Sequence, residues 1–300
     1  MGRGKETKLK HVPNLLTSTD INHYLEFYGI HTEEIEHDYE FLKYGEEKIF
    51  IQSFTPSTPI GMVIVVHGYL DHSGSMKNLI NDLLHKQYLV ITYDLQGHGL
   101  SSGARAEIID FHDYVEVFHE VNQWAKRKTA LPVHVVAHST GGAIIIDYLL
   151  RKQATFQKVI LVSPLIRSHQ WYLSKLGIRL IKPFVYQLTR VFKRNSSDST
   201  YLDFVKQDPL QHHKLPIVWF EALRTWNKKV KDYKKCYEEV LVIQGDRDRT
   251  VDWNYNLTFI QKKFPNCQVR LIHGGDHQLL NEHPRLLNKT LFYIHQGLKE

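Results

Sequence analysis

The sequence predicts an α/β protein with a mostly parallel, doubly wound sheet of about eight strands, flanked by helices. Three observations predict this fold class: short apolar runs rich in β-branched residues, helical patterns between most of them, and an alternating segment ahead of the first run. The chain has 300 residues, of which 42% are hydrophobic. That is enough for one large α/β domain, or for a domain that carries an insertion.

The apolar runs are short and show little polar alternation. This pattern is typical of parallel strands that helices bury on both faces. The six runs are IGMVIVV (60–66), YLVITY (88–93), VHVVA (133–137), KVILVS (158–163), EVLVIQG (239–245) and QVRLI (268–272).

The segments between the runs favour helices. Apolar residues recur at three- and four-residue steps in MKNLINDLLHKQ (76–87) and FHDYVEVFHEVNQWAKRK (111–128). Strands that alternate with helices imply right-handed connections and a doubly wound sheet. Ahead of the first run, EIEHDYEFLKYGEEKIFIQSF (34–54) alternates in two halves around Gly45. We therefore expect an antiparallel hairpin at the edge of the sheet.

The pattern changes after Ser163, because strand-like runs are absent from there to about Tyr237. This stretch is aromatic, basic and helical in period, and Pro183 must kink or break its first helix. An insertion between two strands, lying over the carboxyl ends of the sheet, forms a cap. The predicted parts are an α/β core, residues 1–163 and 236–300, and a helical cap segment, residues 164–235.

The positive charge of the chain gathers in the cap segment. The whole chain has 38 Lys and Arg against 32 Asp and Glu, a net charge of +6, but residues 164–235 hold 15 against 5. Such a face fits a solvated surface, or attraction to an anionic membrane or a phosphate-bearing substrate. No nucleic-acid-binding motif accompanies the charge, so we expect no nucleic acid partner.

Apolar and aromatic side chains recur at mostly four-residue steps from Trp171 to Phe192. The simplest interpretation is that they pack in the core of the cap. The alternative is an apolar lid that covers an acyl chain and touches a bilayer.

Two stretches come close to the G-x-S-x-G pattern of a hydrolytic serine. GLSSG (99–103) matches it literally, but Ser101 lies in a glycine-rich loop well after the preceding strand. AHSTG (137–141) departs by the methyl group of Ala137, yet it joins a predicted strand directly to a predicted helix. A nucleophilic serine needs such a sharp turn, because the turn exposes its hydroxyl at the carboxyl edge of the sheet. We therefore predict Ser139 as the nucleophile, and we interpret the loop at Ser101 as a turn.

A serine hydroxyl needs a histidine base that is itself held by a carboxylate. In a doubly wound hydrolase, the Asp and then the His follow the serine on loops after later strands. Here DRDRTVD follows the run at 239–245, and HGGDHQLLNEH follows the run at 268–272. Position narrows the choice only partly, although Asp252 stands where a helix N-cap is expected. The candidates are Asp246, Asp248 and Asp252 for the acid, and His273, His277 and His283 for the base.

Several motifs stand at the ends of the predicted strands. They are HGYLDHSG (67–74), DLQGHGLSSGAR (94–105) with FHDYV behind it (111–115), AHSTGG, GDRDRTV and GGDHQLL. Together they resemble the α/β-hydrolase superfamily, and within it the monoacylglycerol lipase and lysophospholipase branch. The resemblance spans roughly residues 35–300 and is weak in the cap segment. It implies Asp248 as the acid, His277 as the base, and the backbone N–H groups of Tyr69 and Thr140 as the oxyanion hole.

Three positions depart from the pattern of that branch. Gln96 replaces Arg in D-x-R-G-H-G, Ala137 replaces Gly, and Tyr69 stands where smaller residues are common. The first two remove no catalytic group. Tyr69 is expected to narrow the pocket or to shift the preferred acyl length.

The resemblance implies a serine esterase that cleaves carboxylic esters of a single acyl chain, such as monoacylglycerols or lysophospholipids, through an acyl-enzyme and without a cofactor. The alternatives are a short-chain carboxylesterase, an iminopeptidase-like amidase with the same triad, and a non-catalytic binding protein. Metal catalysis is not expected, because none of the 19 His residues stands in an H-E-x-x-H spacing. His67, His98 and His138 are interpreted as hydrogen-bonding groups that fix loops.

The N-terminal MGRGKETKLKHVPNLL lacks the apolar stretch of a signal peptide, and no run approaches the roughly 20 apolar residues that span a bilayer. Cys236 and Cys267 are too few for a disulfide scaffold. We therefore expect a cytoplasmic protein, peripheral to a membrane where its basic cap contacts one. The oligomeric state stays open.

Overall fold

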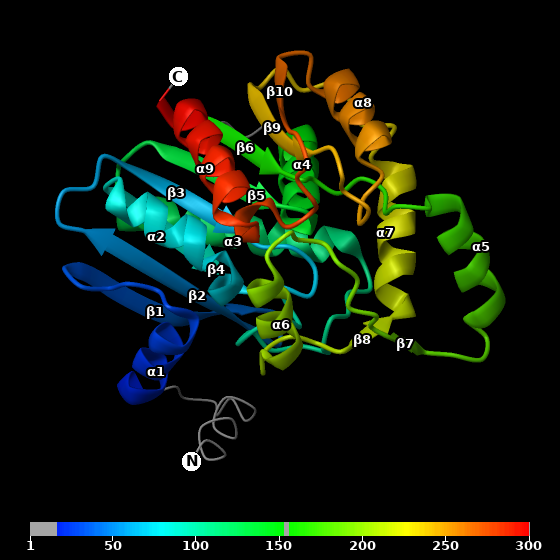
Figure 1. The fold of residues 1–300 in the computed structure, drawn as a ribbon, viewed down its shortest axis with the longest axis horizontal. Coiled ribbons are helices and arrows are strands. Elements are labelled where there is room, and N and C mark those ends of the chain that lie inside the picture. The colour runs from blue at the N-terminus through cyan, green and yellow to red at the C-terminus, as the bar shows by residue number, and fades with distance from the viewer. Residues whose placement is uncertain (1–16, 153–155, 300) are drawn as a thin grey trace.

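The computed structural model describes residues 17–152 and 156–299, in which eight strands form one twisted sheet (Figure 1). Residues 1–16, assigned to the core by the sequence, lie outside the described residues. The strand order is β1-β2-β4-β3-β5-β6-β9-β10. The strands are β1 (Ile35–Tyr44), β2 (Glu47–Pro56), β3 (Gly61–Val66), β4 (Tyr88–Tyr93), β5 (Val133–His138), β6 (Lys158–Val162), β9 (Val240–Gly245) and β10 (Cys267–Ile272).

The sheet is parallel except at one edge. β3, β4, β5, β6, β9 and β10 pair in parallel, whereas β1 pairs with β2, and β2 with β4, in antiparallel register. The edge hairpin turns at Gly45, whose φ of 58° is the left-handed conformation that glycine adopts without strain. The predicted fold, a mostly parallel sheet of eight strands with an antiparallel hairpin at its edge, is therefore confirmed.

Helices cover both faces of the sheet, because the central strands bury side chains on both sides. In β3, Met62, Ile64 and Val66 belong to one hydrophobic cluster, and Val63 and Val65 belong to another. The core helices are α1 (Ser18–Tyr28), α2 (Lys77–His85), α3 (Phe111–Lys128), α4 (Thr140–Lys152), α8 (Trp253–Lys263) and α9 (Pro284–Lys299), with 3-10 turns at Ser73–Met76 and Leu279–Asn281.

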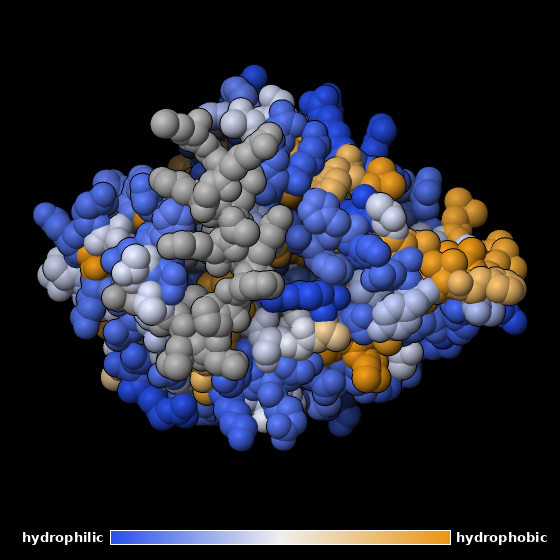
Figure 2. Space-filling view, turned by 90° about the horizontal axis from the view of Figure 1, so that it is seen from below, coloured by the Kyte–Doolittle hydropathy of each residue, from blue (hydrophilic) through white to orange (hydrophobic). Residues whose placement is uncertain are grey.

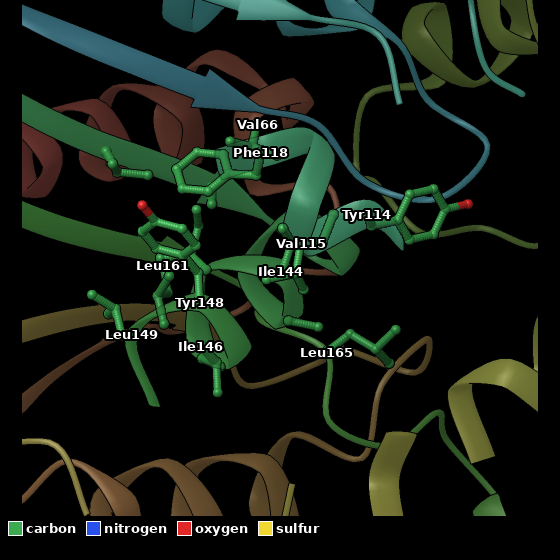
Figure 3. Packing of buried hydrophobic residues seen from close by; sticks show 14 of the residues in the cluster. Val66, Tyr114, Val115, Phe118, Ile144, Ile146, Tyr148, Leu149, Leu161 and Leu165 are labelled. Carbon is green, nitrogen blue, oxygen red and sulfur yellow. The ribbon is translucent and has the colours of Figure 1, made fainter. Parts of the chain in front are cut away.

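The cluster between the sheet and the helices α3 and α4 is shown in Figure 3. Phe118 of α3 meets Tyr148 of α4 edge to face, with ring centroids 4.9 Å apart. The side chain of Asp110 caps α3 by accepting a hydrogen bond from the backbone of His112. This packing fixes α4, whose first residue follows Ser139 directly.

The cap segment lies between β6 and β9 and contains α5 (Trp171–Ile181), β7 (Gln187–Thr189), α6 (Ser199–Gln207), β8 (Lys214–Pro216) and α7 (Ile217–Lys229). α5 ends two residues before Pro183, which agrees with the predicted break. The prediction that this stretch contains no strands is wrong, because β7 and β8 form a short antiparallel ladder. Each has only three residues, too few for an alternating pattern to stand out in the sequence.

The apolar stripe that begins at Trp171 does not pack in the core of the cap. Trp171 itself is buried, at 4% exposure, and Leu188 and Phe192 at the far end are half-buried, but the members between them are exposed. Figure 2 shows hydrophobic side chains gathered at the end of the molecule where α5 lies in Figure 1. The packing interpretation is therefore wrong for this stripe. Its exposed members are Tyr172, Leu176, Leu180 and Phe184, at 58–86% exposure, and Leu173 beside them on α5 is 66% exposed.

None of the helices in the described ranges is both long and apolar enough to cross a membrane.

Candidate active site

Ser139 lies at the sharp turn between β5 and α4. Its φ is 52°, a left-handed conformation that is strained for a residue with a side chain. The turn is held by hydrogen bonds from Ser139 N to Val162 O at 3.0 Å, and from Leu165 N to Ser139 O at 3.0 Å. Both partners lie on β6 or just after it. The neighbouring strand thus sustains the strained backbone at the carboxyl edge of the sheet.

Gly141 lets α4 approach the loop that follows β3. A Cβ atom at this position would lie 2.5 Å from Val66 O and 2.7 Å from His67 O, so no larger residue fits without displacing the backbone. On the same loop, a Cβ atom at Gly68 would lie 3.1 Å from the Cβ of Ser139. The loop that carries Tyr69 therefore lies directly beside the Ser139 side chain.

Ser139, His277 and Asp248 form one buried hydrogen-bonded chain. His277 Nε2 lies 3.0 Å from Ser139 Oγ, and His277 Nδ1 lies 2.7 Å from Asp248 Oδ2. The three residues are 4–7% exposed. They come from the loops after β5, β10 and β9, three strands whose carboxyl ends share one edge of the sheet (Figure 1).

The Asp248 carboxylate is held ionised by its partners. Burial alone raises the pKa of Asp248, but the His277 imidazole and several hydrogen bonds bring it below its ordinary value. Asp248 Oδ1 accepts from the amides of Thr250 at 2.8 Å and Val251 at 3.0 Å. Gln244 Nε2 donates to Oδ2 at 3.1 Å. These donors orient the carboxylate toward His277.

The other acidic and basic candidates lie in different contacts. Asp246 Oδ2 and His273 Nδ1 form a pair of their own at 2.9 Å, and the His273 side chain is 78% exposed. Asp252 caps α8, as its position predicts, by accepting from Tyr255 N. His283 is exposed and lies at the start of α9. Among the described residues, only Asp248 and His277 join Ser139.

Ser101 lies in a different environment from Ser139. It is 1% exposed, its Oγ donates to Asp94 O at 2.6 Å, and it accepts from Phe50 N at 2.9 Å. Gly99 beside it has a φ of 48°. The literal G-x-S-x-G match is thus a glycine-containing turn that joins the ends of β2 and β4.

Tyr69 and Thr140 flank Ser139. Thr140 is the first residue of α4, so its amide has no acceptor within the helix. The Tyr69 hydroxyl donates to Ala106 O at 2.8 Å, and its ring stacks on Trp219 of α7, with centroids 3.7 Å apart. The bulky residue at this position therefore joins the loop after β3 to the cap segment.

A sequence profile of the serine aminopeptidase S33 family matches residues 57–284, most of the chain. The chain belongs to this family of α/β hydrolases. It is 28% identical to the monoglyceride lipase of Rattus norvegicus over 82% of this chain and 85% of that protein. It is also 28% identical to the monoacylglycerol lipase of Mycolicibacterium smegmatis, over 82% and 91% of the two chains.

A solved structure shares the fold of this chain. A soluble variant of monoglyceride lipase from Saccharomyces cerevisiae, in complex with a substrate analog, matches with a TM-score of 0.75 and 20% identity. The match covers 90% of this chain and 96% of that one. The family match and the lipase relatives confirm the resemblance to the monoacylglycerol lipase-like branch, and the protein is a carboxylic ester hydrolase.

The hydrolase has a buried polar network beside Ser139 that the sequence analysis missed. Asp71, at 3% exposure, accepts from Gln278 Nε2 at 3.1 Å and from Gln211 Nε2 at 3.4 Å. His138 Nε2 lies 3.2 Å from His277 O, and burial together with the His277 charge lowers the pKa of His138 to about 4. In the sequence, this network could be anticipated only from the closeness of its members to catalytic motifs: Asp71 lies in HGYLDHSG, and Gln278 directly follows His277.

His72 and Asp208 form a buried pair that joins the core of the hydrolase to its cap segment. His72 Nε2 lies 2.9 Å from Asp208 Oδ2, and the Tyr28 hydroxyl of α1 donates to Asp208 Oδ1 at 2.7 Å. Burial lowers the pKa of His72, but the Asp208 carboxylate outweighs it and the net pKa is raised. Burial raises the pKa of Asp208, but His72 and Tyr28 bring it below its ordinary value.

The stability contributed by this pair is expected to depend on pH. A raised His72 pKa stabilises the fold below about pH 6.5, and the contribution disappears as the pH rises through the folded pKa. A lowered Asp208 pKa stabilises above about pH 3.9, and that contribution disappears as the pH falls through the folded pKa. Asp208→Asn should therefore cost about 3 kcal/mol of unfolding free energy near pH 5 and less near pH 8.5. Urea titrations at both pH values measure the difference, and an equal loss at both would contradict it.

Proposed function

We propose that this hydrolase cleaves carboxylic esters of a single acyl chain, as monoacylglycerol lipases and lysophospholipases do. The observation that supports catalysis most directly is the 3.0 Å contact between Ser139 Oγ and His277 Nε2, because it couples a nucleophile to a base that Asp248 orients. The relatives named as monoglyceride and monoacylglycerol lipases support the substrate class.

In the proposed reaction, His277 Nε2 accepts the Ser139 hydroxyl proton while Oγ attacks the ester carbonyl carbon. The backbone N–H groups of Tyr69 and Thr140 donate to the resulting oxyanion. The ester C–O bond then breaks, and His277 gives its proton to the departing alkoxide. Water loses a proton to the same imidazole and attacks the acyl-enzyme. The fatty acid leaves as His277 returns the proton to Ser139.

Substrate class is tested by a series of esters. We expect kcat/KM to be highest for glycerol or lysophospholipid monoesters with long acyl chains, because the exposed apolar stripe on α5 suits a substrate that resides in a membrane. Highest activity on the shortest p-nitrophenyl esters would favour a short-chain carboxylesterase. Cleavage of aminoacyl amides but not of esters would favour an iminopeptidase-like amidase. Each alternative keeps the same catalytic groups.

We also propose that residues 164–235 act as a cap over the core (1–163 and 236–300) and bring the enzyme to membranes. Two features support this: the cap segment holds 15 Lys and Arg against 5 Asp and Glu, and α5 leaves large apolar side chains in solvent. A helix with one apolar and one basic face lies in the plane of a bilayer surface. Trp219 then contacts the oxyanion loop through Tyr69 on the inner side of the cap.

Replacing apolar residues of the α5 region should weaken adsorption to vesicles. Leu180 and Phe184 are 65% and 86% exposed, so Leu180→Ser and Phe184→Ser should each lower the partition constant about tenfold, the loss of about 1.5 kcal/mol of apolar burial. Ile109 is 85% exposed outside the cap segment, and Ile109→Ser is the matched control. Co-sedimentation measures partition. Equal losses in all three variants would contradict contact through α5.

A further inference from the structure

A groove of about 510 Å³ lies between α5 and α7, on the outer side of the cap segment. Figure 1 shows these helices side by side at one end of the molecule, with α5 outermost. Tyr172 and Leu176 supply apolar lining. The charged lining consists of Lys175, Arg179, Lys182, Arg224 and Lys228, with Glu221 as the single carboxylate.

The groove has far more positive than negative charge. Glu221 lies 2.6 Å from Arg224 and 3.6 Å from Lys182, so its carboxylate is already shared by two cations. Within the described part of the chain, Lys175, Arg179 and Lys228 have no carboxylate within 4 Å. Cations that face one another across a groove repel, and an anion between them removes that repulsion.

The groove lies next to the exposed apolar face of α5, the face proposed to contact a membrane. Successive helix residues are about 100° apart, so Leu173 and Leu180 project from the face next to the one that lines the groove. When such an apolar face enters a bilayer by about 5–10 Å, the neighbouring basic face stands at the level of the headgroups. A lipid phosphate, rather than a dissolved ion, is therefore the anion that the groove meets.

We infer that the groove between α5 and α7 binds the phosphomonoester headgroup of an anionic membrane lipid. A phosphomonoester has about −1.5 to −2 charge and three acceptor oxygens, more than a phosphodiester or a carboxylate offers. Arg179 can bind two of those oxygens through its planar guanidinium, and Lys175 and Lys228 supply point charges. Tyr172 and Leu176 contact the first carbons of the lipid. This inference rests on the proposed membrane contact of the cap segment.

The test measures binding of the inactive Ser139→Ala protein, so that its result is independent of hydrolysis. Co-sedimentation compares vesicles that contain phosphatidic acid with vesicles of equal surface charge that contain phosphatidylserine. We expect tighter binding to phosphatidic acid. The double variant Arg179→Gln/Lys228→Gln should lose about 25-fold in affinity for phosphatidic acid vesicles, about 5-fold per charge, and should lose the preference. The same double variant is also made in the protein that retains Ser139. Its normal hydrolysis of a soluble ester would show that the fold is intact.

The matched control is Lys234→Gln/Lys235→Gln, which removes two exposed charges from the same segment outside the groove. Equal losses in the two double variants, or equal affinity for both kinds of charge-matched vesicle, would overturn the inference in favour of diffuse attraction. Glycerol phosphate that binds the free protein as tightly as the vesicles do would overturn the assignment to a lipid. Failure of the membrane contact itself is distinguishable, because no vesicle would then bind at all.

Discussion

Ser139→Ala is expected to lower kcat by about 10⁶ while leaving the protein folded, because it removes the hydroxyl that contacts His277 Nε2. The substitution deletes a single hydrogen-bonding oxygen, so the free energy of unfolding should change by about 1 kcal/mol or less. Initial rates on a long-chain monoacylglycerol and labelling by a fluorophosphonate probe measure the effect. Retained turnover or labelling in the variant would refute the assignment of the nucleophile.

Ser101→Ala should behave in the opposite way. Ser101 Oγ donates to Asp94 O and accepts from Phe50 N inside the protein, so its removal leaves two buried backbone groups without this partner. We expect a loss of about 1–3 kcal/mol in the free energy of unfolding. The kcat per fluorophosphonate-labelled site should match that of the unsubstituted protein. Loss of activity without loss of stability at this position would reverse the roles of the two serines.

The choice between these serines shows what a sequence determines in this fold. A strand followed at once by a helix predicts a sharp turn, and the structure has this turn at Ser139, where φ is 52°. This local property is the reason to predict Ser139, and not the better literal match at Ser101, as the nucleophile. Most elements of the main sheet were also predictable, since each parallel strand is an apolar run and the edge hairpin alternates around Gly45. Short β7 and β8 were not, because three residues form a ladder only when another part of the chain supplies the partner.

Contacts across long sequence separations could not be predicted from position. Asp246 and Asp248 follow the same strand two residues apart, and only three-dimensional structure shows that one turns to His273 and the other to His277. Asp208 is 136 residues from His72 along the chain. Neither residue type nor spacing indicates such a pair. The family resemblance implied Asp248 and His277, and the structure brings these two residues together with Ser139.

The prediction that the apolar stripe on α5 packs in the core of the cap was wrong for a different reason. Its period predicts an amphipathic helix correctly, but a period does not say what covers the apolar face. In the described structure Leu173 and Leu180 of α5 face solvent, and Lys175 and Arg179 stand on the adjacent face of the same helix, toward α7. The apolar and the basic features of the cap segment, which the sequence offered as separate clues, thus belong to one helix and indicate one surface.

Asp248→Asn is expected to lower kcat by about 10⁴ with little change in KM. The carboxylate accepts from His277 Nδ1 at 2.7 Å, and this bond fixes the tautomer in which Nε2 is free to accept the Ser139 proton. In the Asn variant, the side-chain amide nitrogen can take the place of Oδ2. It would donate to His277 Nδ1 and would stabilise the opposite tautomer. Such an imidazole presents its N–H to Ser139, so it cannot act as the base. A loss confined to KM would indicate that Asp248 serves substrate binding and not the base.

The control for this assignment is Asp246→Asn, two residues away on the same loop. Asp246 contacts His273, whose side chain is 78% exposed, and its removal breaks a surface pair worth about 1 kcal/mol or less. We expect kcat to stay within about 2-fold of the unsubstituted value, because Asp246 does not contact His277. A 2-fold change in rate corresponds to about 0.4 kcal/mol in the free energy of activation. Parallel measurement of both variants on one ester decides the question. A 10⁴-fold loss in Asp246→Asn with normal activity in Asp248→Asn would contradict the assignment of Asp248 as the acid, because Asp246 contacts His273 and not His277.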